Sequence, residues 1–240
     1  MKKFNLYFFI IIGILSCADK NSLFEELSPF RTGVKFSNDL AYDETFNIFT
    51  YRNYYNGGGV GLGDINNDGL IDIFFNSNLE KNRLYLNKGD FKFEDITDFA
   101  GVAGTKSWST GVSIADINAD GFLDIYVSNS GDIKGDNKQN ELYINNGDLT
   151  FTEMAADYGL DDTGYSTHAA FFDYDRDGDL DCYLLNNSYK GGFRITNIGT
   201  NQRPIRDSVG GDKLFRNDDG YFNDVSEESG IYGSVIGCLI

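Results

Sequence analysis

The stretch Asp64-Ile65-Asn66-Asn67-Asp68-Gly69-Leu70-Ile71-Asp72 decides the fold of this chain of 240 residues, because its pattern occurs three times. The other two copies occupy residues 116–124 and 173–181. In each copy an oxygen-bearing side chain stands at positions 1, 3, 5 and 9, and glycine stands at position 6. The glycine permits the sharp turn that brings position 9 round to the others. Ca²⁺ binds six to eight oxygens at about 2.3–2.6 Å, so each copy is a candidate calcium loop.

The loops offer two kinds of candidate metal ligand. The side chains at positions 1, 3, 5 and 9 are Asp64, Asn66, Asp68 and Asp72, then Asp116, Asn118, Asp120 and Asp124, then Asp173, Asp175, Asp177 and Asp181. The backbone carbonyl at position 7 is a further candidate in Leu70, Phe122 and Asp179. The pattern predicts about three bound Ca²⁺ ions, and its alternative is a set of acidic β-turns without metal.

The sequence after each loop excludes an EF-hand. An EF-hand loop needs a bidentate Glu at position 12, followed by a helix. Position 12 is Phe75, Val127 or Leu184 here, within a short apolar run of β-branched and aromatic residues. Such runs are typical of buried strands, so we expect each loop to join two strands.

The loops lie within a longer repeat of four short apolar segments separated by turn residues. The first segments are residues 59–63, 111–115 and 169–172, and the second segments directly follow the loops. The third segments are residues 83–87, 141–145 and 213–217, and the fourth are 91–96, 149–154 and 221–225. Helical periodicity is nearly absent, apart from short turns near residues 98–100 and 154–158. Four strands per repeat predict an all-β fold, a partial β-propeller of about three blades with calcium loops between the first and second strands.

The repeat continues imperfectly at both ends of the chain. A fourth-strand pattern occurs early, at residues 24–27, which predicts an outer strand without the rest of its blade. After Phe222 the next loop is expected to begin at about residue 244 or 245, by the spacing of the earlier repeats. The sequence ends at Ile240. We therefore expect residues 24–240 to form an open propeller arc that breaks off inside a repeat and whose unpaired edges favour self-association.

The loops and their flanking G-V-x-x-x-D and L-Y-x-N segments resemble FG-GAP/VCBS repeats of integrin-α-like β-propellers. They are similar to the bacterial proteins of that group and to the N-terminal part of acidic repeat proteins that end in an ASPIC/UnbV domain. The resemblance covers roughly residues 24–240 and implies that the four side chains of each loop bind Ca²⁺ between the first two strands of a blade. No ASPIC/UnbV segment is visible in the sequence.

The N-terminus is typical of a secreted bacterial lipoprotein. Lys2 and Lys3 precede an apolar run that is too short for a membrane span, which predicts a signal peptide over residues 1–16. Cys17 directly follows a small residue and is the expected lipidated N-terminus after cleavage, ahead of a polar tether over residues 17–23. The alternative is an ordinary signal peptide with an incidental cysteine. We expect a lipid-anchored protein of the bacterial cell envelope, at the outer membrane or cell surface.

Composition limits the partners. Lys and Arg number 20 against 37 Asp and Glu, a net charge of −17, which disfavours nucleic acid. Cys182 falls in an expected core strand and is interpreted as a small apolar residue, with a disulfide to Cys238 as the disfavoured alternative.

Two segments outside the repeat are candidate ligand surfaces. The insertion over residues 187–212 carries basic and aromatic side chains suited to an anionic or glycan ligand: Tyr189, Lys190, Arg194, Arg203 and Arg206. The aromatic residues between Tyr51 and Gly59 are expected to pack at the entrance to the first blade, or to line a binding rim. The lone histidine, His168, is interpreted as a packing residue close to a calcium loop.

No catalytic constellation occurs in the sequence: there is no nucleophile elbow, zinc spacing or distinguishable carboxylate pair. We expect a non-enzymatic module that binds a glycan, protein or matrix partner at the cell surface. The alternatives are the propeller part of a polysaccharide-active enzyme and a truncated fragment without independent function.

Overall fold

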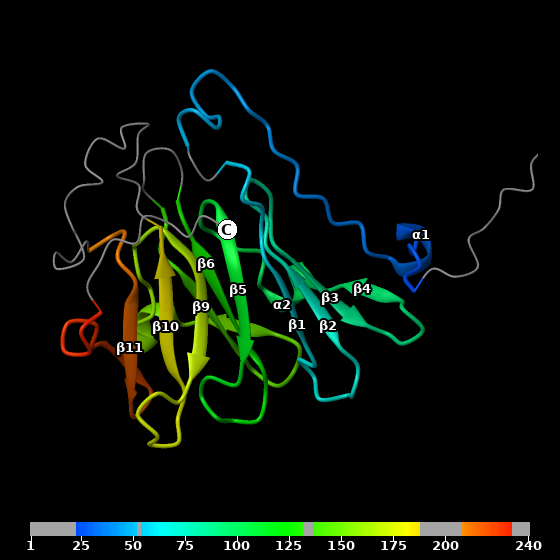
Figure 1. The fold of residues 1–240 in the computed structure, drawn as a ribbon. Coiled ribbons are helices and arrows are strands. Elements are labelled where there is room, and N and C mark those ends of the chain that lie inside the picture. Colours follow the sequence, from blue (N-terminus) through cyan, green and yellow to red (C-terminus); the bar gives the residue numbers. More distant parts are fainter. Residues whose placement is uncertain (1–22, 52–53, 132–136, 188–207, 232–240) are drawn as a thin grey trace, which may run out of the picture.

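The computed structural model describes residues 23–51, 54–131, 137–187 and 208–231, and these contain three four-stranded antiparallel sheets (Figure 1). Each sheet uses four strands in chain order, and we call the sheets blades 1, 2 and 3. Blade 1 contains β1 (Val60–Gly63), β2 (Asp72–Phe75), β3 (Arg83–Asn87) and β4 (Phe93–Asp95). Blade 2 contains β5 (Ser109–Ala115), β6 (Asp124–Asn129), β7 (Glu141–Asn145) and β8 (Phe151–Glu153). Blade 3 contains β9 (Ser166–Phe172), β10 (Asp181–Asn186), β11 (Lys213–Asp218) and β12 (Tyr221–Asp224).

The helices of the described residues are single turns. They are α1 (Pro29–Thr32), α2 (Thr97–Ala100) and α3 (Ala155–Tyr158). Each ends at a glycine in the left-handed conformation: Gly33, Gly101 and Gly159. In α2 and α3 the turn leads from the outer strand of one blade to the first strand of the next. Within the described part of the chain, no helix has the length and apolar character that crossing a membrane requires.

The hydrophobic core lies between neighbouring blades. Leu84 and Phe74 of blade 1 belong to one buried cluster with Val112 and Ile125 of blade 2. A second cluster joins blade 2 to blade 3, and it contains Tyr126, Leu142, Leu184 and Cys182, which is fully buried as expected. Each blade is therefore stabilised mainly by burying apolar area against the next one.

The three blades stand side by side and do not close into a ring within the described residues (Figure 1). The prediction of a partial propeller is confirmed, with the loops between the first and second strands of each blade. The predicted outer strand at residues 24–27 is wrong, because these residues form no strand and precede α1. Phe24 is 88% exposed there. A strand forms only beside a neighbour with which it exchanges backbone hydrogen bonds.

Candidate metal centres

The three loops lie at the same edge of the blades, at the bottom of the view in Figure 1. Each loop ends where the second strand of its blade begins, so the position-9 residues Asp72, Asp124 and Asp181 open β2, β6 and β10. Position-6 glycines have φ of +84°, +91° and +105° at Gly69, Gly121 and Gly178, as the turn requires.

The position-9 carboxylates are buried and pin each loop to its sheet. Asp72 accepts hydrogen bonds from the backbone N–H of Ile65 at 3.0 Å and of Asn87 at 2.7 Å. Asp124 accepts from Ile117 and Asn145, and Asp181 from Tyr174 and Asn217, in the same way. All three aspartates are at most 1% exposed. One carboxylate thus joins the start of the loop, the second strand and the third strand.

The asparagines at the ends of the third segments hold the loops in place, a role that sequence reasoning missed. Each accepts from a nearby backbone N–H and donates to the loop: Asn87 to Ile71 O at 2.8 Å, Asn145 to Leu123 O at 3.1 Å and Asn217 to Leu180 O at 3.3 Å. The sequence does show an asparagine repeated at the end of each third segment. It does not show that this asparagine lies beside the loop, because that depends on the register between the second and third strands.

Loops 1 and 2 hold positions 1, 3 and 5 together through hydrogen bonds. In loop 1, Asp64 accepts from the backbone N–H of Asp68 at 3.1 Å and of Gly69 at 2.7 Å. The Asn66 amide donates to the carboxylate of Asp68 at 3.0 Å. Loop 2 repeats these contacts with Asp116, Asn118 and Asp120. An amide at position 3 therefore reduces the repulsion between the carboxylates at positions 1 and 5.

Loop 3 has a different arrangement because position 3 is a carboxylate. Asp175 cannot donate a hydrogen bond, and Asp173 accepts instead from the backbone N–H of Arg176 at 2.6 Å. The carboxylate oxygens of Asp173, Asp175 and Asp177 lie within 4.8 Å of one another and are exposed. Three negative charges this close repel one another until a cation is bound.

The loops perturb the pKa values of their own acids. The pKa of Asp124 is raised to about 6, mainly by burial and also by the carboxylates of Asp120 and Asp116, while the hydrogen bonds from the backbone N–H groups of Asn145 and Ile117 lower it. The pKa of Asp72 is raised for the same first reason. Asp179, the additional acid at position 7 of loop 3, has its pKa raised to about 6 by burial and by Asp177.

The donor set fits a hard divalent cation. Positions 1, 3 and 5 bring oxygens together on the open side of each loop, where the side chains of Asp64, Asn66 and Asp68 are solvent-accessible. Carboxylate and amide oxygens without nitrogen or sulfur ligands match Ca²⁺ better than zinc or copper. The buried position-9 acid already accepts two backbone hydrogen bonds, so a metal would use its remaining lone pairs.

The other sequence candidates fall in three places. The insertion spans residues 187–212 between β10 and β11, and its named basic and aromatic residues lie outside the described residues, as does Cys17. Tyr51 and Tyr54 are buried with Trp108 in an aromatic cluster, which confirms the packing interpretation for these two residues, whereas Tyr55 is 65% exposed. His168 is exposed on β9, beside Gly111 of β5.

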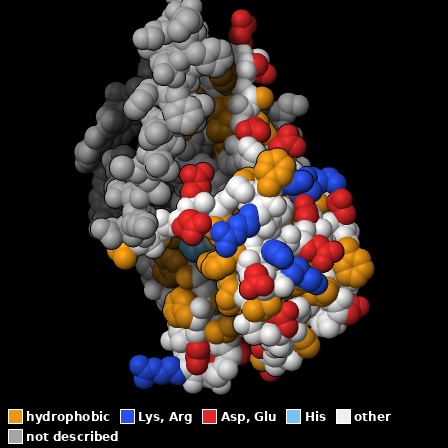
Figure 2. All heavy atoms as spheres, turned by 90° about the vertical axis from the view of Figure 1, so that its right-hand side faces the viewer, with side chains coloured by type: hydrophobic (Ala, Val, Ile, Leu, Met, Phe, Trp, Pro, Cys, Tyr) orange, Lys and Arg blue, Asp and Glu red, His pale blue; other side chains and the backbone are white. Residues whose placement is uncertain are grey.

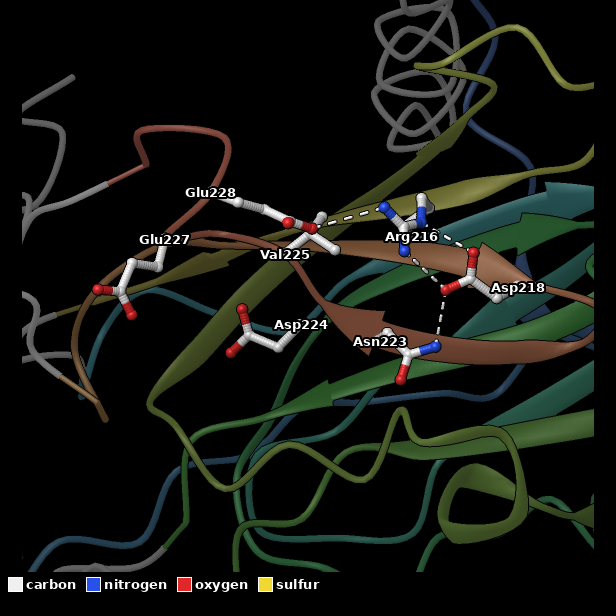
Figure 3. A pocket seen from close by; sticks show the side chains of 7 residues that line it. All are labelled: Arg216, Asp218, Asn223, Asp224, Val225, Glu227 and Glu228. Carbon is white, nitrogen blue, oxygen red and sulfur yellow. Dashed lines mark hydrogen bonds and ion pairs between the residues drawn. The ribbon is translucent and has the colours of Figure 1, made fainter.

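Blade 3 also has an open depression lined largely by acidic side chains (Figure 3). Its one cation, Arg216, is bound by Asp218 at 2.8 and 3.0 Å and by Glu228 at 3.5 Å. Asn223 donates to the same Asp218 carboxylate at 2.9 Å. The guanidinium is thus already neutralised, and the depression offers an anionic ligand little charge.

Comparison with known proteins agrees with this architecture. A model of the FG-GAP-like repeat matches residues 64–127 and 130–184. Cartilage acidic protein 1 of Xenopus tropicalis is 33% identical over 144 residues, which is 58% of this chain and 21% of the relative. The human protein of that name is 28% identical over 69% of this chain and 24% of its own length. The chain thus spans about a fifth to a quarter of the length of these relatives.

The matched residues include all three loops and run from the start of loop 1 in blade 1 to the second strand of blade 3. The chain is therefore an FG-GAP-like repeat protein whose repeats form blades of a partial β-propeller.

Proposed function

We propose that this FG-GAP module binds Ca²⁺ at its three loops and uses the metal to stabilise its blades. The observation that carries the proposal is that the side-chain oxygens at positions 1, 3 and 5 of a loop lie close together. Loop 3 shows this most clearly, because all three positions are carboxylates there: Asp173, Asp175 and Asp177. Bound Ca²⁺ supplies positive charge that offsets the clustered acids. Because position 9 joins each loop to two strands, ordering the loop also holds the sheet edge.

Thermal unfolding with Ca²⁺ and then with EGTA tests this proposal. A ligand at 100 times its Kd stabilises the folded state by about 2.7 kcal/mol per site, so the midpoint should rise clearly with Ca²⁺. Asp120→Asn should lose part of the rise. Asp157→Asn, an exposed acid on α3, should keep all of it. An identical midpoint in both buffers would remove the basis for the proposal.

We further propose that the module binds a glycan or protein at the cell surface and has no enzymatic activity of its own. Its support is the propeller architecture together with the basic and aromatic insertion over residues 187–212 on an otherwise acidic chain. The test is binding of purified chain to a panel of immobilised polysaccharides and matrix proteins. Replacing Arg203 and Arg206 by Ser should weaken binding to the anionic members, and an unchanged profile would exclude the insertion as the contact.

The proposed location is the bacterial envelope, with Cys17 carrying the lipid. Its support is the order of basic residues, short apolar run and cysteine in residues 1–17. Expression in a bacterial host followed by membrane fractionation tests it. Wild type should fractionate with membranes and Cys17→Ser should be released, whereas a wholly soluble wild type with an unmodified N-terminus would contradict the anchor.

A further inference from the structure

One hydrogen bond crosses directly from loop 1 to loop 2. The side-chain amide of Asn67, at position 4 of loop 1, donates to the carbonyl of Gly121, at position 6 of loop 2, at 3.0 Å. Gly121 itself donates its N–H to Asp116 at 2.9 Å, which is a candidate metal ligand of loop 2. A movement of either loop is therefore transmitted to the other at the exposed edge of the blades.

A second connection between the same loops is buried. Asn145 donates its side-chain amide to Ile65 O in loop 1 at 2.8 Å, and its backbone N–H to Asp124 in loop 2 at 2.9 Å. Ile65 in turn donates its N–H to Asp72 at 3.0 Å. The position-9 acids of the two loops are thus joined through Ile65 and Asn145. All four residues are at most 3% exposed, which strengthens each hydrogen bond.

Loops 2 and 3 lack both connections within the described residues. Asn217, which corresponds to Asn145, donates to Asp181 and to Leu180 O of its own blade and makes no bond to Ile117 of loop 2. Ala119 stands in loop 2 where loop 1 has Asn67, so it has no amide to extend toward loop 3. The three loops are therefore a linked pair and a separate third loop.

We propose that loops 1 and 2 bind Ca²⁺ cooperatively, as a coupled pair, and that loop 3 binds it independently. The inference rests on the proposed calcium binding. Binding at loop 1 fixes Asp68, Asp72 and the Ile65 carbonyl, and so holds Asn145 in the position that fixes Asp124. The second ion then meets a loop whose ordering is already complete. Linkage requires the effect to be equal in both directions.

Calorimetric titration with Ca²⁺ measures the coupling in variants that each lack one ligand side chain. Asp68→Ala, Asp120→Ala and Asp177→Ala each remove the position-5 ligand of one loop. Asp177→Ala alone leaves loops 1 and 2 able to bind metal. Combining it with Asp68→Ala leaves only loop 2, and combining it with Asp120→Ala leaves only loop 1. The overall affinity of the pair should exceed the product of the two single-loop affinities at least about fivefold. The same cycle for loops 2 and 3, in the Asp68→Ala background, should give a ratio near one.

Asn67→Ala in the Asp177→Ala background should reduce the coupling without removing either site. Alanine is tolerated in this conformation, because Ala119 adopts φ of 58° at the same position, against 59° for Asn67. Asn223→Ala, an exposed amide whose bond to Asp218 remains within blade 3, is the matched control and should leave the coupling unchanged.

Three results are decisive in different ways. A ratio near one for loops 1 and 2, with metal bound at each loop, overturns the coupling and leaves calcium binding intact. Equal coupling between loops 2 and 3 overturns the assignment of the hydrogen-bonded pair. Absence of any calcium heat in wild type overturns the proposed function, and the coupling with it.

Discussion

At the scale of single residues, the difference between Asn and Asp at position 3 determines how each loop is organised without metal. Asn66 and Asn118 donate to the acids at position 5 at 3.0 and 2.8 Å, so loops 1 and 2 are closed by their own hydrogen bonds. Asp175 cannot donate, and loop 3 keeps three carboxylates in proximity. Loop 3 should therefore gain most from a bound cation.

Asp124 predicts how the calcium-free protein responds to pH. Its pKa is about 6 when folded and 3.8 by the reference value, so the folded state binds the proton more tightly. Its contribution to stability is present at low pH and is lost as the pH rises through about 6. In EGTA, Asp124 should therefore add more to the free energy of unfolding, measured with urea, at about pH 5 than at about pH 7. Asp124→Asn should shrink this contribution, and an unchanged pH profile in the variant would contradict the assignment.

The candidate ligands could be predicted from the sequence because their spacing alone identifies the loop. Their surroundings could not. The burial of Asp72 and its bond to Asn87 join residues from different strands, and they depend on a cross-strand register that periodicity does not give. The role of Asn145 could not be predicted for the same reason, because its side-chain amide donates to the carbonyl of Ile65 in another blade.

At the scale of elements, the short turns that end in glycine pack against the outer strand of the blade that follows them. A Cβ at Gly33 would lie 2.4 Å from Phe93 O, and a Cβ at Gly159 would lie 2.7 Å from Phe222 O. Gly230 ends the corresponding turn after blade 3, with φ of +72°, and no atom of the described residues lies within 4 Å of its Cβ position. Gly159 and Gly230 therefore end equivalent turns, one of which lies against the backbone of the next blade while the other has no described atom beside it.

This pair of junctions predicts different costs for one substitution. Gly159→Ala and Gly230→Ala both place alanine at a positive φ, which costs roughly 1–2 kcal/mol. Only Gly159→Ala also forces a side chain against the neighbouring backbone, for roughly 1–3 kcal/mol more. The free energy of unfolding from urea titration measures both. Equal losses in the two variants would show that the junction at Gly159 is not close-packed.

Strand positions could largely be predicted because each blade repeats the same four apolar segments. The third segments at residues 83–87 and 141–145 coincide with β3 and β7. The prediction failed at residues 24–27, whose pattern matches an outer strand but which form no strand. Local pattern gives the propensity to form a strand, and the neighbouring strand decides whether it forms.

At the scale of the whole molecule, the outward faces of blades 1 and 3 differ. Figure 2 shows hydrophobic side chains among charged ones on the side that blade 1 forms, where Val60 and Leu62 are 58% and 63% exposed. On β9, His168 stands where β5 has Gly111, and a Cβ at Gly111 would lie 2.4 Å from Thr167 O. The imidazole Nδ1 of His168 lies 2.7 Å from the same Cβ position, so β5 and β9 approach closely only because residue 111 is glycine.

The exposed face of blade 1 predicts concentration-dependent self-association of this chain. Apolar side chains on an uncovered sheet face lower their free energy by burial against another surface. Val60→Ser with Leu62→Ser should reduce the association measured by analytical ultracentrifugation. Phe99→Ser, which removes a side chain 66% exposed on α2, is the control and should have little effect. A wild type that stays monomeric at every concentration would contradict the prediction.

The central claim is that each of the three loops binds one Ca²⁺, and counting bound metal tests it most directly. Equilibrium dialysis followed by elemental analysis should give about three calcium ions per wild-type chain, one for each loop pattern. Asp120→Ala should give one fewer, while Asp157→Asn should keep the full number. No bound calcium in wild type, or a count that Asp120→Ala leaves unchanged, would contradict the claim.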